Sequence, residues 1–132
     1  MRGTKPRLAT NPEASLSRAP PVPSYLSKDS KDEWRRVVPS LVAKGIVTST
    51  DLATCESYCI AVGAVREASR TIGKEGLFVN GKAHPAVSVM LRMQNQARLL
   101  AAELGLTPMS RSRAAMQGNP DDDQADDADL GV

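Results

Sequence analysis

The first hydrophobic stripe along the chain predicts a short amphipathic helix that begins near residue 30. Its apolar positions are spaced three or four residues apart, as on one face of a helix. They are Trp34, Val37, Val38, Leu41 and Val42. Ser30 and Glu33 fit a capping box at its start, in which each side chain bonds the backbone amide of the other residue. We expect Pro39 to kink this helix and Gly45 to end it in a left-handed conformation.

A second and longer pattern predicts a helix that runs to Gly73 or Gly76. Thr48 and Asp51 have the spacing of an N-terminal cap, with an acid three residues after the threonine. The apolar positions inside the helix step by three and four residues, like a heptad seam with one polar member. They are Cys55, Tyr58, Val62, Val65, Ser69 and Ile72.

A small β-hairpin and a third helix are predicted next. The apolar run 77–79 leads into Asn80 and Gly81, a pair that tolerates positive φ and favours a two-residue turn, and residues 82–84 form a very short return strand. Pro85 suits the first turn of the third helix, and Gly105 ends it. A second seam runs along this helix. Its members are Ala86, Met90, Met93, Ala97, Leu100 and Leu104.

These elements predict a mainly all-α fold. A short first helix should accompany a long antiparallel helical hairpin, because two seamed helices joined by a short connection fold back on each other. The small β-hairpin should lie at the tip of the helical hairpin. Ordinary packing within one chain explains both seams, and the pattern does not separate that role from an additional contact between subunits.

The chain divides into three regions. Residues 1–27 hold five prolines and several basic residues, so we expect a basic arm that is disordered or extended. Residues 28–113 should form the helical core, with oligomerisation and DNA-binding roles, and residues 106–113 should leave the third helix as a turn and a basic extension. Residues 114–132 should be an acidic disordered tail. Because no signal peptide and no apolar run of about 20 residues is found, we expect a soluble intracellular protein with no membrane partner.

The net charge of +2 conceals an uneven distribution. Six of the fifteen acids lie in residues 121–129, so nine acids face all seventeen bases in residues 1–120, which carry +8. A basic body with an acidic tail indicates a polyanionic partner, and a tail that competes with this partner for the same surface. The simpler alternative is a tail that only aids solubility.

Several groups of basic residues could neutralise phosphates without reading bases. The candidate DNA-binding residues are Arg2, Lys5, Arg7, Lys28, Lys31, Arg35, Arg36, Arg111 and Arg113. For Arg66, Arg70 and Lys74 we favour a solvated helix face paired with Glu67 and Glu75. With four aromatic residues in the whole chain, duplex DNA is a better candidate than a single strand, which needs stacking platforms.

The sequence shows no catalytic pattern, and we expect no enzyme, no cofactor and no metal. Its glycines match no phosphate-binding loop. The single histidine, His84, precedes Pro85 and is interpreted as a turn residue or helix cap. Cys55 and Cys59 share a helix face and are interpreted as small buried hydrophobes, because a zinc site needs more ligands.

The order of these elements resembles the small terminase subunits of tailed bacteriophages, in particular the P27 group. The resemblance covers about residues 1–113. It rests on residues 2–6 (Arg-Gly-Thr-Lys-Pro), Pro23 and Leu26, residues 34–39 (Trp-Arg-Arg-Val-Val-Pro) with Leu41, Gly45–Thr48 ahead of Asp51, Tyr58–Cys59, His84–Ala86, residues 104–108 (Leu-Gly-Leu-Thr-Pro) and Ser110–Arg113.

The resemblance implies a ring-forming, non-catalytic protein of the host cytoplasm. Such proteins recognise double-stranded viral DNA and regulate a large terminase subunit, which supplies the ATPase and nuclease. Two alternatives remain open at this point. One is a helix-turn-helix regulator, although the second helix begins with Ser49, Thr50 and Asp51 rather than with base-reading side chains. The other is a purely structural helical scaffold.

Overall fold

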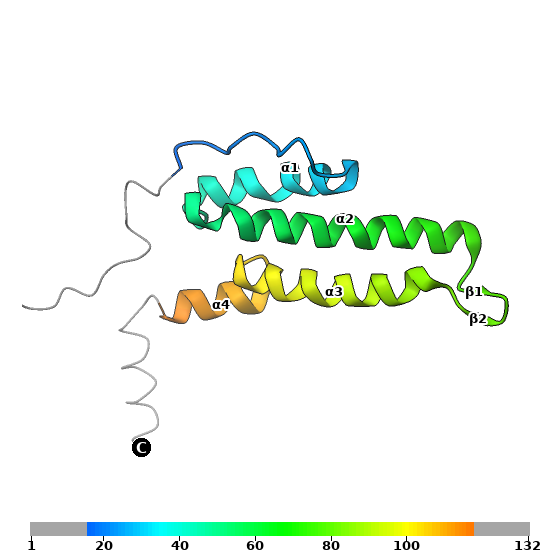
Figure 1. Ribbon diagram of the computed structural model, residues 1–132. Helices are drawn as coiled ribbons and strands as arrows, with labels where there is room; N and C mark the ends of the chain where they lie inside the picture. Colours follow the sequence, from blue (N-terminus) through cyan, green and yellow to red (C-terminus); the bar gives the residue numbers. More distant parts are fainter. Residues whose placement is uncertain (1–15, 118–132) are drawn as a thin grey trace, which may run out of the picture.

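Helices dominate the computed structural model, which describes residues 16–117 (Figure 1). The elements in order are α1 (Lys28–Ala43), a short 3-10 helix η2 (Ser49–Asp51), α2 (Leu52–Glu75), β1 (Phe78–Val79), β2 (Lys82–Ala83), α3 (Pro85–Glu103) and α4 (Pro108–Gln117). The predicted mainly all-α class is confirmed. So is the long helical hairpin, α2 with α3, that carries a small β-hairpin at its tip.

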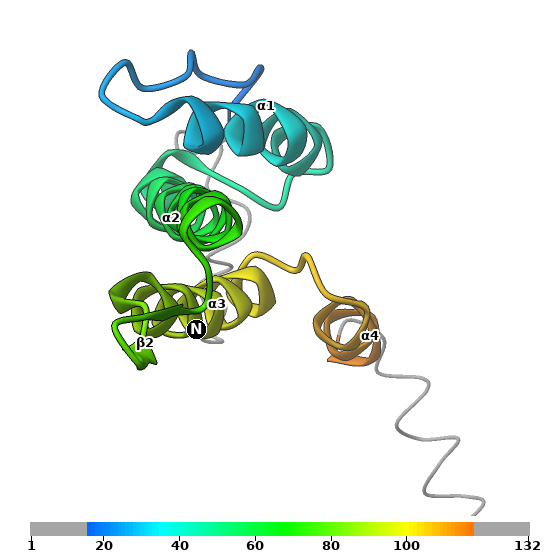
Figure 2. The ribbon, with the colours of Figure 1, turned by 90° about the vertical axis from the view of Figure 1, so that its right-hand side faces the viewer.

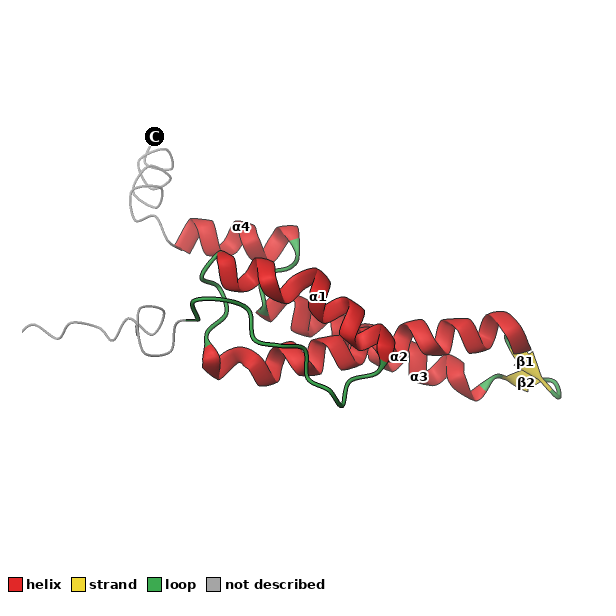
Figure 3. Ribbon diagram, turned by 90° about the horizontal axis from the view of Figure 1, so that it is seen from above, coloured by secondary structure: helices red, strands yellow, loops and turns green. Residues whose placement is uncertain are grey.

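The helices form three layers with α2 in the middle. Figure 2 shows α1 on one side of α2 and α3 on the other, while α4 stands beside the end of α3. With 24 residues, α2 is about 36 Å long at 1.5 Å per residue. The β-hairpin lies at one end of the α2–α3 pair, and α4 lies at the other end (Figure 3). The described chain begins and ends at the α4 end of the molecule (Figure 1).

The start of α1 differs from the prediction. Ser27 is the N-cap, and its hydroxyl accepts a hydrogen bond from the Ser30 amide at 3.2 Å. Ser30 therefore lies within the first turn, and the capping box predicted for Ser30 and Glu33 is wrong. The carboxylate of Glu33 instead turns into the α1–α2 interface, where two arginines and a tyrosine bond it more fully than one backbone amide could.

Most of the predicted turns and caps are confirmed. Thr48 donates its amide to the Asp51 carboxylate at 3.0 Å ahead of α2, which completes a capping box. Asn80 and Gly81 have φ of 53° and 76°, so two left-handed residues in succession close the β-hairpin and pair Val79 with Lys82. His84 caps α3, because its Nδ1 accepts from the Ala86 amide at 2.9 Å.

The hydrophobic core lies between α1 and the first half of α2. Every predicted apolar position of the first helix is buried, and Trp34 is only 2% exposed. The other core residues are Leu26, Val47, Cys55, Tyr58, Cys59 and Leu104. Within its bounds α3 has no buried residue. One core therefore stabilises α1 and the start of α2, and α3 packs with one side only.

The two predicted seams have different outcomes. The members of the seam on α3 within its bounds are half-buried, and Leu104 is buried, as expected for the side that faces α2. On α2 Cys55 and Tyr58 are buried, Val62, Val65 and Ile72 are half-buried, and the polar member Ser69 is exposed, but several residues outside the seam are buried as well, namely Cys59, Ala61, Gly63 and Ala68. The difference arises because α2 packs against α1 and α3 on two sides, so its buried residues do not form a single stripe.

Two segments beside the core also depart from the prediction. Residues 16–27 form no helix or strand and pack on the core, where Leu26 is buried and the Tyr25 hydroxyl donates to Glu56 at 2.6 Å. The expected turn and basic extension after α3 is instead the helix α4, which continues to Gln117. The predictions for residues 1–15 and 118–132 concern chain outside the described residues.

Candidate nucleic-acid interface

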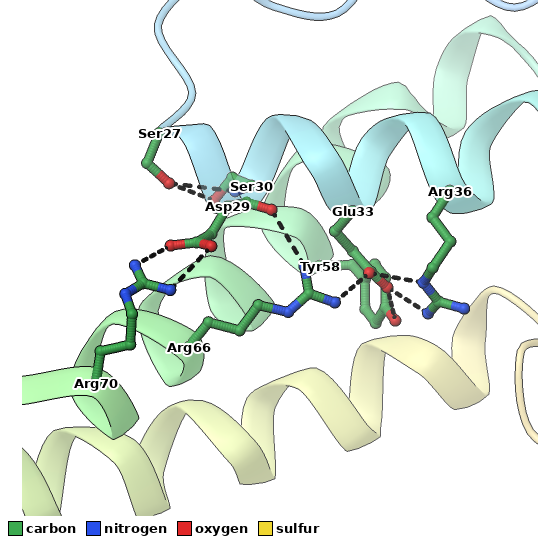
Figure 4. A network of polar contacts seen from close by, with 8 residues as sticks. All are labelled: Ser27, Asp29, Ser30, Glu33, Arg36, Tyr58, Arg66 and Arg70. Atoms are coloured by element: carbon green, nitrogen blue, oxygen red, sulfur yellow. Dashed lines mark hydrogen bonds and ion pairs between the residues drawn. The ribbon is translucent and has the colours of Figure 1, made fainter. Parts of the chain in front are cut away.

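A buried carboxylate, Glu33, joins α1 to α2 (Figure 4). Its side chain is 1% exposed and accepts four hydrogen bonds. Arg36, one turn later on α1, donates Nε at 2.8 Å and Nη2 at 2.6 Å. From α2, Arg66 donates Nη2 at 2.8 Å and Tyr58 donates its hydroxyl at 2.6 Å. Each carboxylate oxygen thus has two donors, so the buried charge is fully bonded.

The charge state of Glu33 follows from these contacts. Burial by itself would raise the pKa of Glu33, but the hydrogen bonds from Arg36 and Tyr58 and the charges of Arg36 and Arg66 lower this pKa to about 2. Burial and the bond to Glu33 raise the pKa of Tyr58 to about 12, so its hydroxyl keeps its proton. Close by, Arg70 donates to both oxygens of Asp29, and this contact lowers the pKa of Asp29.

The first turn of α1 lies close against Gly63 of α2, where a side chain would clash. A Cβ at Gly63 would lie 2.1 Å from the Ser30 hydroxyl oxygen, 3.0 Å from the Ser30 backbone nitrogen and 3.1 Å from the Ser27 hydroxyl oxygen. The first turn of α1 therefore rests directly on the α2 backbone. This approach is what brings Glu33 within reach of Arg66.

The arginines of α2 pair with acids, as predicted, but the predicted partners are wrong. Arg66 and Arg70 do form ion pairs, but with Glu33 and Asp29 of α1 rather than with Glu67 and Glu75 of their own helix. Glu75 instead lies 3.3 Å from Nε2 of His84. Because Nδ1 of His84 already accepts a hydrogen bond, the ring proton is on Nε2, which donates a hydrogen bond to the Glu75 carboxylate. The spacing of residues in the sequence identifies possible ion pairs within one helix, but it does not identify partners on a different helix.

Three candidate DNA-binding residues on α1 form one group, in which Lys28 and Arg35 are exposed and Lys31 is half-buried. Lys28, Lys31 and Arg35 share a face at spacings of three and four residues. Asp32 lies among them, 3.4 Å from Nζ of Lys28 and 3.6 Å from Nη1 of Arg35. Such exposed pairs are weak, so these cations can turn to a phosphate at little cost. Arg36 differs, because Nε and Nη2 are already bonded to Glu33.

The other described candidates, Arg111 and Arg113, lie on α4. They line an open groove of about 520 Å³, the α3–α4 groove, between the end of α3, α4 and the turn after α1. Its lining residues are Ile46, Ala102, Glu103, Gly105, Ser110, Arg111 and Arg113. The structure thus separates the described candidates into two groups, one on α1 and one on α4, which stands beside the end of α3 (Figure 2). Arg2, Lys5 and Arg7 lie outside the described residues.

Sequence reasoning missed α4 and the role of Glu33. A signal for α4 was present, because Thr107 followed by Pro108 matches an N-cap with proline in the first turn. Thr107 and Ser110 accordingly bond each other's amides, at 3.1 and 3.2 Å. Glu33 gave no comparable signal, since its partners Tyr58 and Arg66 lie 25 and 33 residues away.

The described residues offer little for other kinds of site. Among residues 16–117, no three His, Cys, Asp or Glu side chains come together as a metal site would require. Cys55 and Cys59 are free thiols with no exposure, and burial raises the pKa of Cys55 to about 11 and that of Cys59 to about 12. In the same part of the chain, no helix has the length and apolar character needed to span a membrane.

Comparison with known proteins identifies a family for this chain. Neither the curated proteins nor the solved structures include a match to this chain. The family model described as "Phage terminase, small subunit" matches residues 30–121, well over half of the 132 residues. The match includes α1 from Ser30 onward, the α2–α3 hairpin with its β-turn, and α4. The chain therefore belongs to the family of phage terminase small subunits, which act in the packaging of phage DNA.

Proposed function

We propose that this protein binds double-stranded viral DNA, assembles into a ring and recruits or regulates the large terminase subunit in the host cell. The observation that carries the proposal is the family match over residues 30–121. The protein itself contributes no catalysis in this proposal, and the large subunit supplies the ATPase and nuclease. Membership of the P27 group remains a prediction from the sequence.

DNA binding in this proposal depends on phosphate contacts from α1 and α4. Lys28, Lys31 and Arg35 provide a basic face on α1, and Arg2, Lys5 and Arg7 precede it in the chain. Arg111 and Arg113 provide a second basic group in the α3–α4 groove. Arg36 contributes through Nη1 alone, because its other nitrogens are bonded to Glu33. Contacts of this kind hold the backbone without reading the sequence.

Ring assembly is supported by apolar surface on the α2–α3 hairpin. Ile60 of α2 is 45% exposed, and Val89, Leu91 and Leu99 of α3 are 45%, 58% and 52% exposed. An α3 without buried residues stabilises a monomer poorly, and burial of these side chains against another copy would supply the missing apolar contact. A repeated contact of one kind closes into a ring when its rotation permits.

The helix-turn-helix alternative has less support. A recognition helix needs free polar side chains at its start. The segment that begins α2 has Asp51 instead, and its carboxylate is already bonded to the Thr48 amide and hydroxyl. A carboxylate at this position would also repel phosphates. The family match and this contact both favour DNA packaging.

Native mass spectrometry of the full chain, alone and with a short duplex, tests the proposal directly. We expect a single closed oligomer at micromolar concentration that takes up duplex as one unit. Addition of the oligomer to the large subunit should change its DNA-dependent ATP hydrolysis. A monomer or dimer under these conditions would contradict ring assembly, and an oligomer that ignores duplex would contradict DNA binding.

A further inference from the structure

The α3–α4 groove combines an apolar floor with two arginines at its edge. Ile46, Ala102 and Gly105 line it beside Arg111 and Arg113. Nη1 of Arg111 donates to the Leu106 carbonyl at 3.2 Å, and Nη2 of Arg113 lies 3.6 Å from the Met109 sulfur. Within residues 16–117, neither guanidinium forms an ion pair with a carboxylate. One acid, Glu103, also lines the groove, so its arginines outnumber its acids by two to one.

The acidic end of the chain begins beside this groove. Gln117 ends α4, and residues 118–132 follow it with six aspartates and no base. Along the α4 axis, Arg113 and Arg111 lie about 6 and 9 Å behind Gln117, at about 1.5 Å per residue. The chain from Gln117 to Asp121 can extend about 13 Å, at about 3.3 Å per residue. The first aspartate can therefore fold back to either arginine without strain.

We propose that the aspartate-rich segment 121–129 occupies the α3–α4 groove of its own chain and there competes with DNA phosphates. Its carboxylates pair with Arg111 and Arg113, while the backbone between them covers the apolar floor. Attachment through a few residues gives the segment a local concentration on the order of millimolar, so weak pairs suffice to fill the groove. The competition with DNA rests on the proposed function, whereas the occupancy of the groove does not.

The first experiment tests the occupancy without DNA. A full-length acceptor chain has the six tail aspartates replaced by asparagine, and a labelled peptide of residues 118–132 is titrated into it by fluorescence anisotropy. We expect Arg111→Gln with Arg113→Gln to weaken peptide binding about two- to thirtyfold, the range for two exposed ion pairs. The control, Lys74→Gln with Lys82→Gln, removes the same charge near the β-hairpin end and should change nothing. Absence of binding, or equal loss in both variants, overturns the proposal.

A second arm establishes which chain supplies the occupant. The unaltered full chain should bind the labelled peptide about tenfold more weakly than the acceptor does, because its own tail already fills the groove. Occupancy within one chain predicts the same ratio at every protein concentration. A ratio that grows with protein concentration would assign the occupant to a neighbouring copy and overturn the intrachain form.

The third arm concerns DNA. If the peptide binds with a dissociation constant of about 0.1 mM, a millimolar local concentration fills about nine-tenths of the grooves and weakens DNA binding about tenfold. Neutralising the tail should therefore tighten duplex binding about tenfold at low salt and have little effect at high salt. If the unaltered chain and the chain with the neutralised tail bind duplex equally well at low salt, the competition with DNA is overturned, even if the peptide binds the groove. Failure of both chains to bind duplex would count against the proposed function and not against the occupancy.

Discussion

Replacement of Gly63 by alanine should destabilise the protein, although alanine is the better helix former. A Cβ at this position would lie 2.1 Å from the Ser30 hydroxyl oxygen and 3.0 Å from the Ser30 backbone nitrogen. The hydroxyl can rotate only into a site that is itself buried, and the backbone can move only with the first turn of α1. The extra methyl group must therefore push α1 away from α2.

The expected size follows from two opposing terms. Alanine favours a helix interior over glycine by about 1 kcal/mol. Overpacking a buried contact costs about 1–3 kcal/mol, and disturbing the Ser27 cap adds about 1 kcal/mol. The net change is a loss of about 1–3 kcal/mol in the free energy of unfolding. Separation of Glu33 from Arg66 would increase this loss.

Gly73→Ala is the matched control. Gly73 lies in the same helix, has no positive φ, and a Cβ there would meet nothing within 4 Å. The helix preference then acts alone, and Gly73→Ala should stabilise by about 0.5–1 kcal/mol. Urea unfolding at equal protein concentrations, followed by far-UV circular dichroism, should show midpoints that move in opposite directions for the two variants.

A double variant locates the cause. In a Gly63→Ala background, Ser30→Ala removes the nearest oxygen and should restore part of the lost stability, since residues in contact are energetically coupled. Independent, additive losses would show that the clash does not involve Ser30. A Gly63→Ala protein as stable as the original chain would refute the close approach itself.

Four other outcomes follow from the structure. Trp34→Ala should cost about 3–5 kcal/mol of unfolding free energy in urea titration, because Trp34 anchors the core; unchanged stability would place it outside the core. The pKa of Glu33 is lower in the folded protein than in the unfolded chain, so ionised Glu33 stabilises the fold fully above pH 4.5, and this contribution disappears as pH falls through about 2. In acid unfolding, Glu33→Gln should lack this part of the pH dependence of stability. Arg35→Gln should reduce the salt-dependence slope of duplex binding by about 0.9, measured by anisotropy, without changing the melting temperature. A thiol reagent should modify Cys55 and Cys59 only in denaturant, and rapid reaction of the native protein would contradict their burial.

Local signals account for what could be predicted from the sequence. The Asn80–Gly81 turn, the Pro85 helix start and the Trp34 stripe each depend on residues close together in the chain, and the structure confirms them. These features fixed the mainly helical class and the hairpin. They also placed four candidate DNA-binding residues around the first helix, namely Lys28, Lys31, Arg35 and Arg36.

Contacts between distant residues account for the rest. Glu33 resembled half of a capping box because its nearest partner in sequence was Ser30, but burial beside α2 gave it Tyr58 and Arg66 instead. The seam on α2 was read as one stripe, whereas two helices pack against α2 from different sides. Neither fact is visible before the helices are placed together. The grouping of Ile46 with Arg111 in one groove was hidden for the same reason.

The two ends of the α2–α3 helical hairpin differ in chemistry, and this difference has a consequence for an assembly of several copies. At the β-turn end Leu77, Phe78 and Val79 are exposed in succession, whereas Arg111 and the attachment point of the acidic tail lie at the opposite end. Copies set side by side in one direction would form an apolar rim and a charged rim. A single duplex at the charged rim would meet several weak grooves at once, and each contact would raise the local concentration for the next. The strength of DNA binding would then depend on the number of copies in the assembly more than on any single groove.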